Sequence, residues 1–126
     1  ITSEVIKEKE KLFCFDGFQF PYQKIPYHSK VAVYGAGKVG NAFVEQLNNS
    51  RYARCVLWVD KKSDELDDSR IKRIGELNSD EYDYDYVIIA IDNKDIAMKV
   101  KGDLLTRGVN VEKIVWDEYN KKWNSI

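Results

Sequence analysis

Four short apolar runs lie in the chain after residue 30, at residues 31–34, 55–59, 86–91 and 114–116. The first run stops at a glycine, and the next two stop at aspartates. Uninterrupted apolar runs of this length, bounded by polar or turn-forming residues, are typical of strands that are buried on both faces. We therefore predict four sheet strands at these positions.

Helical spacing of apolar residues follows the first and the third of these runs. Residues 38–48 and the segment that begins after Asp92 each alternate apolar and polar positions with the period of a helix. Gln46 falls among the polar positions of the first segment, and Gly108 is placed to end the second in a left-handed conformation. The apolar positions are Val39, Ala42, Phe43 and Leu47 in the first helix and Ile96, Ala97, Val100, Leu104 and Leu105 in the second.

The order of these segments predicts the fold class. Residues 61–69 indicate a loop with room for one helical turn, and residues 71–77 fit either a short strand or a helical turn. Strands that alternate with helices predict an α/β domain with a doubly wound, mainly parallel sheet and right-handed crossovers.

Aromatic residues crowd the chain before the first strand. We assign residues 1–29 to an N-terminal arm, with a short charged helix at residues 3–12, and residues 30–126 to the domain itself. The arm contains both prolines, which a central strand excludes. Its aromatic side chains have two open roles: they fill the domain's own core, or they form a surface for a neighbouring catalytic domain or a second copy. The residues concerned are Phe13, Phe15, Phe18, Phe20, Tyr22, Tyr27, Trp116, Tyr119 and Trp123.

Composition narrows the classes of partner. In 126 residues, 20 Lys and Arg face 21 Asp and Glu, so the net charge of −1 predicts neither nucleic acid nor an anionic membrane as a partner. No apolar run approaches the ~20 residues of a membrane span. Cys14 and Cys55 lack the spacing of a zinc site or a disulfide framework, which favours a reducing, cytoplasmic location. The chain starts at Ile1 without Met, and we expect a piece of a longer protein.

The glycine turn at residues 35–40 has the pattern Gly-x-Gly-x-x-Gly directly between a predicted strand and a predicted helix. Gly35 allows the tight turn, Gly37 lets backbone amides approach a pyrophosphate, and Gly40 lets the helix pack against the strand. The free N–H groups of the helix N-terminus then attract an anion. In this position the motif predicts a Rossmann-like fold with a phosphate-binding turn.

Two further strand ends extend the predicted site. Asp60 follows the second strand 20 residues after Gly40, where a carboxylate accepts hydrogen bonds from a ribose diol. It would repel a 2′-phosphate and so favours NAD over NADP, although neighbouring lysines weaken that preference. NAD(P) is the expected cofactor, and a nucleotide sugar or coenzyme A also presents a diphosphate to such a turn. The predicted binding residues are Gly35, Ala36, Gly37, Lys38, Val39, Gly40, Asp60, Lys61, Ile91 and Asp92.

Residues 25–40, 56–60, 84–91 and 112–116 resemble the Rossmann domains attached to bacterial polysaccharide-biosynthesis glycosyltransferases and sugar methyltransferases. The nucleotide-binding domain of nucleotide-sugar dehydratases and epimerases is similar, and the resemblance covers residues 20–116. It implies a nucleotide or nucleotide-sugar ligand, with the three glycines of the turn at the pyrophosphate and Asp60 at a ribose. The full-length enzymes carry a separate catalytic domain, so the resemblance places the chemistry elsewhere.

Catalytic candidates are scarce in this chain. His28 lies in the arm, and the Tyr34-x-x-x-Lys38 spacing straddles the glycine turn instead of lying on a later helix. We predict neither a catalytic residue nor a metal ligand. The leading hypothesis is a binding module of a polysaccharide-biosynthesis enzyme. One alternative is the cofactor domain of a dehydratase, epimerase or oxidoreductase, and the other is a degenerate fold used for dimerisation or docking.

Overall fold

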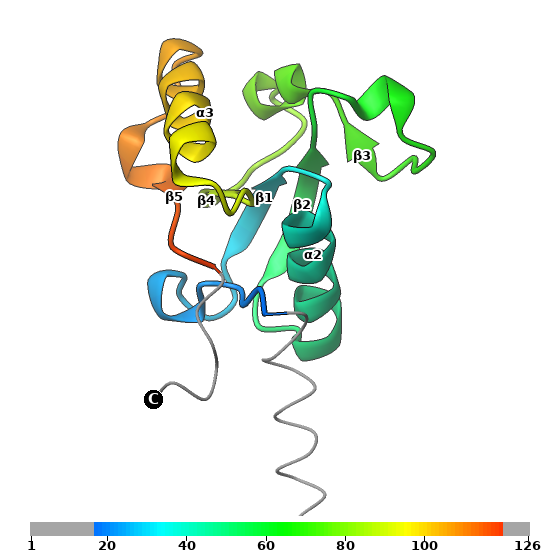
Figure 1. Cartoon of the computed structure of the whole chain (residues 1–126), viewed down its shortest axis with the longest axis vertical. Coiled ribbons are helices and arrows are strands. Elements are labelled where there is room, and N and C mark those ends of the chain that lie inside the picture. Colours follow the sequence, from blue (N-terminus) through cyan, green and yellow to red (C-terminus); the bar gives the residue numbers. More distant parts are fainter. Residues whose placement is uncertain (1–16, 120–126) are drawn as a thin grey trace, which may run out of the picture.

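The structure, a computed structural model, describes residues 17–119 as an α/β domain around one parallel sheet (Figure 1). The strand order is β3-β2-β1-β4-β5, and every neighbouring pair is parallel. The chain builds outward from β1 on one side and then returns to the other, so the order reverses between β1 and β4. The strands are β1 (Lys30–Tyr34), β2 (Arg54–Val59), β3 (Ile71–Lys72), β4 (Tyr86–Ile89) and β5 (Ile114–Val115).

Two α-helices cover opposite faces of the sheet, which confirms the predicted doubly wound class. Because side chains alternate along a strand, Val31 and Val33 pack into the cluster that contains the apolar side of α2 (Lys38–Ser50). Ala32 packs into the cluster under α3 (Lys94–Thr106) on the other face. In Figure 1 the chain passes from the end of β1 through a short turn into α2, which lies in front of the sheet.

Within residues 17–119 the predicted elements are present, with differences at their ends. β4 stops at Ile89, two residues before the end of the apolar run, because the chain leaves the sheet towards Asn93, whose side chain accepts a hydrogen bond from Ile96 and begins α3. Residues 71–77 form both of the expected structures in turn, the strand β3 and then a 3-10 helix, η3 (Ile74–Asn78). Gly108 ends α3 with φ +91°, as predicted.

The described part of the arm, which begins at Gly17, is held against α2 by a buried glutamine. Gln46 is 0% exposed, so its assignment to the polar side of the helix was wrong. Its Oε1 accepts the backbone N–H of Phe20 at 3.0 Å, and its Nε2 donates to the carbonyl of Phe18 at 2.8 Å. A buried amide satisfied on both sides fixes the arm to the domain.

Two of the aromatic residues concerned, Phe20 and Tyr119, fill the domain's own core, whereas Tyr27 of the arm is 63% exposed. Phe20 and Tyr119 are both buried, and each packs edge-on against Phe43 of α2. A short 3-10 helix, η1 (Tyr22–Lys24), then leads towards the sheet. The predicted helix at residues 3–12 and the aromatic residues Phe13, Phe15 and Trp123 lie outside the described residues.

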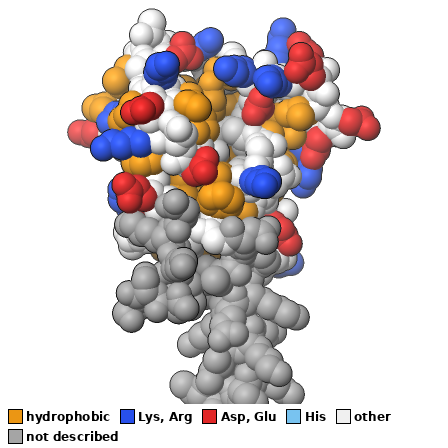
Figure 2. Space-filling model, viewed as in Figure 1, with side chains coloured by type: hydrophobic (Ala, Val, Ile, Leu, Met, Phe, Trp, Pro, Cys, Tyr) orange, Lys and Arg blue, Asp and Glu red, His pale blue; other side chains and the backbone are white. Residues whose placement is uncertain are grey.

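The surface carries both charges. On the face seen in Figure 2, acidic and basic side chains are interspersed over the described part of the domain. Across residues 17–119, no helix is both long and apolar enough to cross a bilayer.

Candidate functional site

A cavity of about 460 Å³ opens at the carboxyl edge of the sheet, where the strand order reverses. Open parallel sheets bind ligands at this position. Nine of the ten predicted binding residues line it, and the tenth, Gly40, lies beneath the turn. The cavity is lined by Phe18, Tyr34, Gly35, Ala36, Gly37, Lys38, Val39, Asp60, Lys61, Lys62, Ala90, Ile91, Asp92, Ile96 and Val100.

Each glycine of the turn has a different steric environment. Gly35 has φ +119°, and a Cβ there would come within 2.9 Å of the Ala90 carbonyl oxygen on the neighbouring strand end. A Cβ on Gly40 would overlap the carbonyl of Gly35, so α2 approaches β1 as closely as predicted. Gly37 has an ordinary φ of −83° and no atom within 4 Å of its missing Cβ. Of the two turn glycines that line the cavity, Gly35 and Gly37, only Gly37 has open space at its Cβ position.

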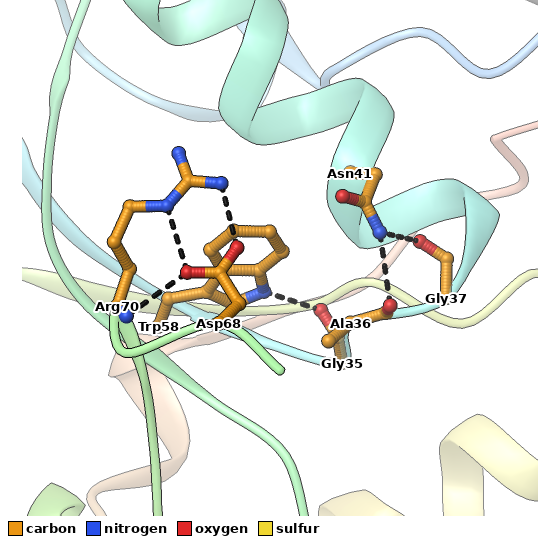
Figure 3. A network of polar contacts seen from close by, with 7 residues as sticks. All are labelled: Gly35, Ala36, Gly37, Asn41, Trp58, Asp68 and Arg70. Atoms are coloured by element: carbon orange, nitrogen blue, oxygen red, sulfur yellow. Dashed lines mark hydrogen bonds and ion pairs between the residues drawn. The ribbon is translucent and has the colours of Figure 1, made fainter. Parts of the chain in front are cut away.

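The carbonyl groups of the turn are tied to side chains of the domain (Figure 3). The indole Nε1 of Trp58 donates to the buried Gly35 carbonyl at 2.7 Å. Asn41 Nδ2 donates to the carbonyls of Ala36 at 2.9 Å and Gly37 at 2.8 Å. These bonds fix the backbone conformation of the turn before any ligand arrives.

The amide groups of the turn have two different roles. The N–H of Ala36 donates to Asp60 Oδ2 at 2.8 Å and is therefore already used. The first N–H groups of α2, from Lys38 to Gly40, have no carbonyl within the helix to receive them. Gly37, the N-cap residue, has no side chain that could cap them. The helix N-terminus thus offers donors and a partial positive charge to an anion in the cavity.

Asp60, predicted as a ribose acceptor, also holds the turn in place. Besides the Ala36 bond, its Oδ1 accepts the N–H of Lys62 at 2.7 Å. Each carboxylate oxygen has a second acceptor position, so the half-buried side chain retains capacity for a hydroxyl group in the cavity. Asp60 therefore joins the end of β2 to the turn after β1 by a hydrogen bond, and it is also the residue that the motif assigns to a ribose.

An apolar wall faces the turn from α3. Ile96 and Val100 lie one helical turn apart and line the cavity with Ile91. Ile96 is one of the apolar positions predicted for this helix, and it is 51% exposed. Among the predicted apolar positions of this helix, burial is complete only for Ala97 and Leu104. An exposed isoleucine beside a strand end gives the cavity a flat apolar surface.

A salt bridge covers the outer side of Trp58. The Arg70 guanidinium lies 5.2 Å from the indole centroid and makes two hydrogen bonds to Asp68, at 3.0 and 2.7 Å. The hydrogen bonds from Arg70 lower the pKa of Asp68 to about 2. The pair keeps its charges across the ordinary pH range and shields the indole that supports the turn.

The titratable side chains that line this cavity are Tyr34, Lys38, Asp60, Lys61, Lys62 and Asp92. Among the described residues that line it there is no histidine or cysteine. His28 is exposed and stacks on Tyr27. Tyr34 does line the cavity together with Lys38, but burial, followed by the charges of Asp103 and Asp60, raises its pKa. Burial also raises the pKa of Cys55, to about 11. Over the described residues, no cluster of three potential metal ligands occurs.

A family model described as C2185-like, N-terminal, matches residues 27–115. The chain belongs to the C2185-like N-terminal family. The matched residues of this family run from just before β1 to the end of β5, so they include the glycine turn, Asp60 and α3. They leave out the arm residues 17–26. A comparison with curated proteins found no match.

Proposed function

We propose that this domain binds NAD(P) or a nucleotide sugar, holds the ligand's diphosphate at the glycine turn and performs no chemistry of its own. The observation that carries the proposal is the uncapped N-terminus of α2, which opens into a 460 Å³ cavity at the reversal of strand order. Backbone donors fixed in this way suit a group whose charge is spread over several oxygens.

The charges around the cavity favour an anionic ligand. Lys38, Lys61 and Lys62 line it against two carboxylates, Asp60 and Asp92. Asp60 already accepts two backbone hydrogen bonds, which offset its charge where the ligand would lie. Its remaining acceptor positions suit a ribose diol and favour NAD over NADP.

The apolar wall supplies the surface that a nucleobase requires. Ile91, Ile96 and Val100 lie on the α3 side of the cavity, opposite the N-terminus of α2. With the ribose at Asp60 and the diphosphate at the turn, the base lies against these side chains. Apolar lining with a few placed polar groups is the usual composition of a cofactor site.

We propose that the module serves a polysaccharide-biosynthesis enzyme whose catalytic groups lie outside this chain. The resemblance of residues 20–116 to such domains supports this role, and so does the lack of a histidine or cysteine among the described residues that line the cavity. Phe20 and Tyr119 pack in the domain's own core, so they are not free to form a docking surface.

The test is a matched pair of glycine variants. Gly37→Asp puts a carboxylate where the diphosphate is proposed, and Gly75→Asp makes the same change in η3, away from the cavity. Both positions have open space at Cβ, so both variants should fold. In calorimetric titrations with NADH and UDP-glucose, Gly37→Asp should weaken binding by about 100-fold or more, whereas Gly75→Asp should bind normally. Equal binding by the two variants would contradict the proposal.

A further inference from the structure

One wall of the cavity comes from the arm. The half-buried Phe18 lines the cavity together with the glycine turn. It packs with Ala36 onto the cluster on the α2 face of the sheet, whereas Ile91 and Val100 pack onto the cluster on the α3 face. The cavity therefore crosses the edge of the sheet, with Phe18 at its α2 side and the apolar wall at its α3 side.

Phe18 is held firmly in this position. Its carbonyl accepts a hydrogen bond from Gln46, a side chain with no exposed surface. Gln19 donates to the carbonyl of Tyr119 at 3.1 Å, and Phe20 is fully buried against Phe43. Three successive arm residues are thus anchored to α2 and to the end of the described chain. These contacts fix the backbone that carries Phe18 beside the cavity.

Phe18 bounds the cavity on the α2 side, which bears on the length of the ligand. A dinucleotide lies across such a crevice with one nucleoside on each side of its diphosphate. If the function proposed above holds, one nucleoside occupies the space between Asp60 and Ile96, and the diphosphate lies at the N-terminus of α2. The group beyond the diphosphate must then enter the α2 side, where the ring of Phe18 stands.

We propose that Phe18 is a specificity-determining residue that limits the site to one nucleoside diphosphate carrying a single sugar, and excludes the second nucleoside of a dinucleotide. This inference rests on the proposed function and chooses between its two ligand classes. Phe18 lies outside the residues 27–115 that match the family model.

The test compares ligands that differ only beyond the diphosphate. ADP-glucose is paired with NADH, and UDP-glucose with diuridine diphosphate, so that base and diphosphate charge match within each pair. Dissociation constants are measured for the full chain, for Phe18→Ala and for Tyr22→Ala. Tyr22 is a control from the same arm, because it packs on the same cluster without lining the cavity.

The full chain should bind the sugar nucleotide of at least one pair about tenfold or more tighter than its dinucleotide partner. In Phe18→Ala that difference should fall to about threefold or less, whereas Tyr22→Ala should keep it. If the full chain binds a dinucleotide as tightly as its sugar nucleotide, or if Phe18→Ala leaves the difference unchanged, the role of Phe18 is refuted and the proposed function stands. If none of the four ligands binds, the proposed function itself fails.

Discussion

Replacing Trp58 by phenylalanine tests how the glycine turn is held. The indole N–H is the donor to the Gly35 carbonyl, at 2.7 Å, and both residues are buried. Phenylalanine keeps an aromatic ring in the core but has no donor. The buried carbonyl of Gly35 would then lose the side-chain donor that it has in the native protein.

The cost has two parts. A buried acceptor left without its donor costs about 1–3 kcal/mol of folding free energy. The smaller ring loses packing against its neighbours, which adds up to about 1.5 kcal/mol. We therefore expect Trp58→Phe to lower the free energy of unfolding by about 2–4 kcal/mol, a large share of the 5–15 kcal/mol typical of a domain.

Trp116 provides the matched control for this experiment. Its indole N–H also donates at 2.7 Å to a backbone carbonyl, that of Ile91 just beyond the end of β4. That hydrogen bond is only partly buried. Water can replace the donor there, so Trp116→Phe should lose about 1 kcal/mol less than Trp58→Phe. Urea denaturation followed by far-UV circular dichroism measures both values. Equal losses, or a loss below about 0.5 kcal/mol for Trp58→Phe, would refute the reasoning.

Two further predictions concern packing and titration. Gly40→Ala should lower the free energy of unfolding by about 2 kcal/mol or more, because the added methyl group would overlap the Gly35 carbonyl. The control Gly102→Ala, in open space on α3, should be neutral or stabilising. Urea denaturation curves that coincide for the two variants would contradict this prediction. On a Cys14→Ser background, Cys55 should react with a thiol-reactive dye at pH 8 only after denaturation, because burial raises its pKa to about 11. Because the pKa of Cys55 is higher in the folded than in the unfolded state, the stability that the neutral thiol contributes is complete below pH 9 and is lost as the pH rises through 11. Rapid labelling of the native protein at pH 8 would contradict both statements.

The features that the sequence predicts best depend on neighbours in the chain. The glycine turn joins a strand directly to a helix, and the conformational freedom of Gly35 and the close contact at Gly40 follow from that local geometry. Asp60 and Ile91 lie at strand ends, and parallel strands bring those ends to one edge. The nine predicted binding residues that line the cavity could therefore be found without any knowledge of the packing of side chains.

The features that were missed depend on contacts between distant segments. Gln46 looks like a solvated helix position, and its burial follows only from the arm that crosses it. The arm itself carries no regular pattern, so nothing indicated that Phe18 would reach the cavity at the glycine turn. Trp58 gave a usable signal, because an indole N–H inside an apolar strand requires an acceptor, but the sequence does not say which one.

Side chains that hydrogen-bond to the glycine turn determine whether a substitution there affects stability, ligand affinity or both. Trp58, Asn41 and Asp60 each hold a different backbone group of the turn, so the turn is rigid before a ligand binds. A preorganised site spends little binding free energy on ordering itself. For the same reason, changes at the supports alter stability and affinity together. A Cβ at position 37 would meet no other atom within 4 Å, so a side chain can be added there without disturbing the fold. Gly37 is therefore the position in the turn where loss of binding can be separated from loss of folding.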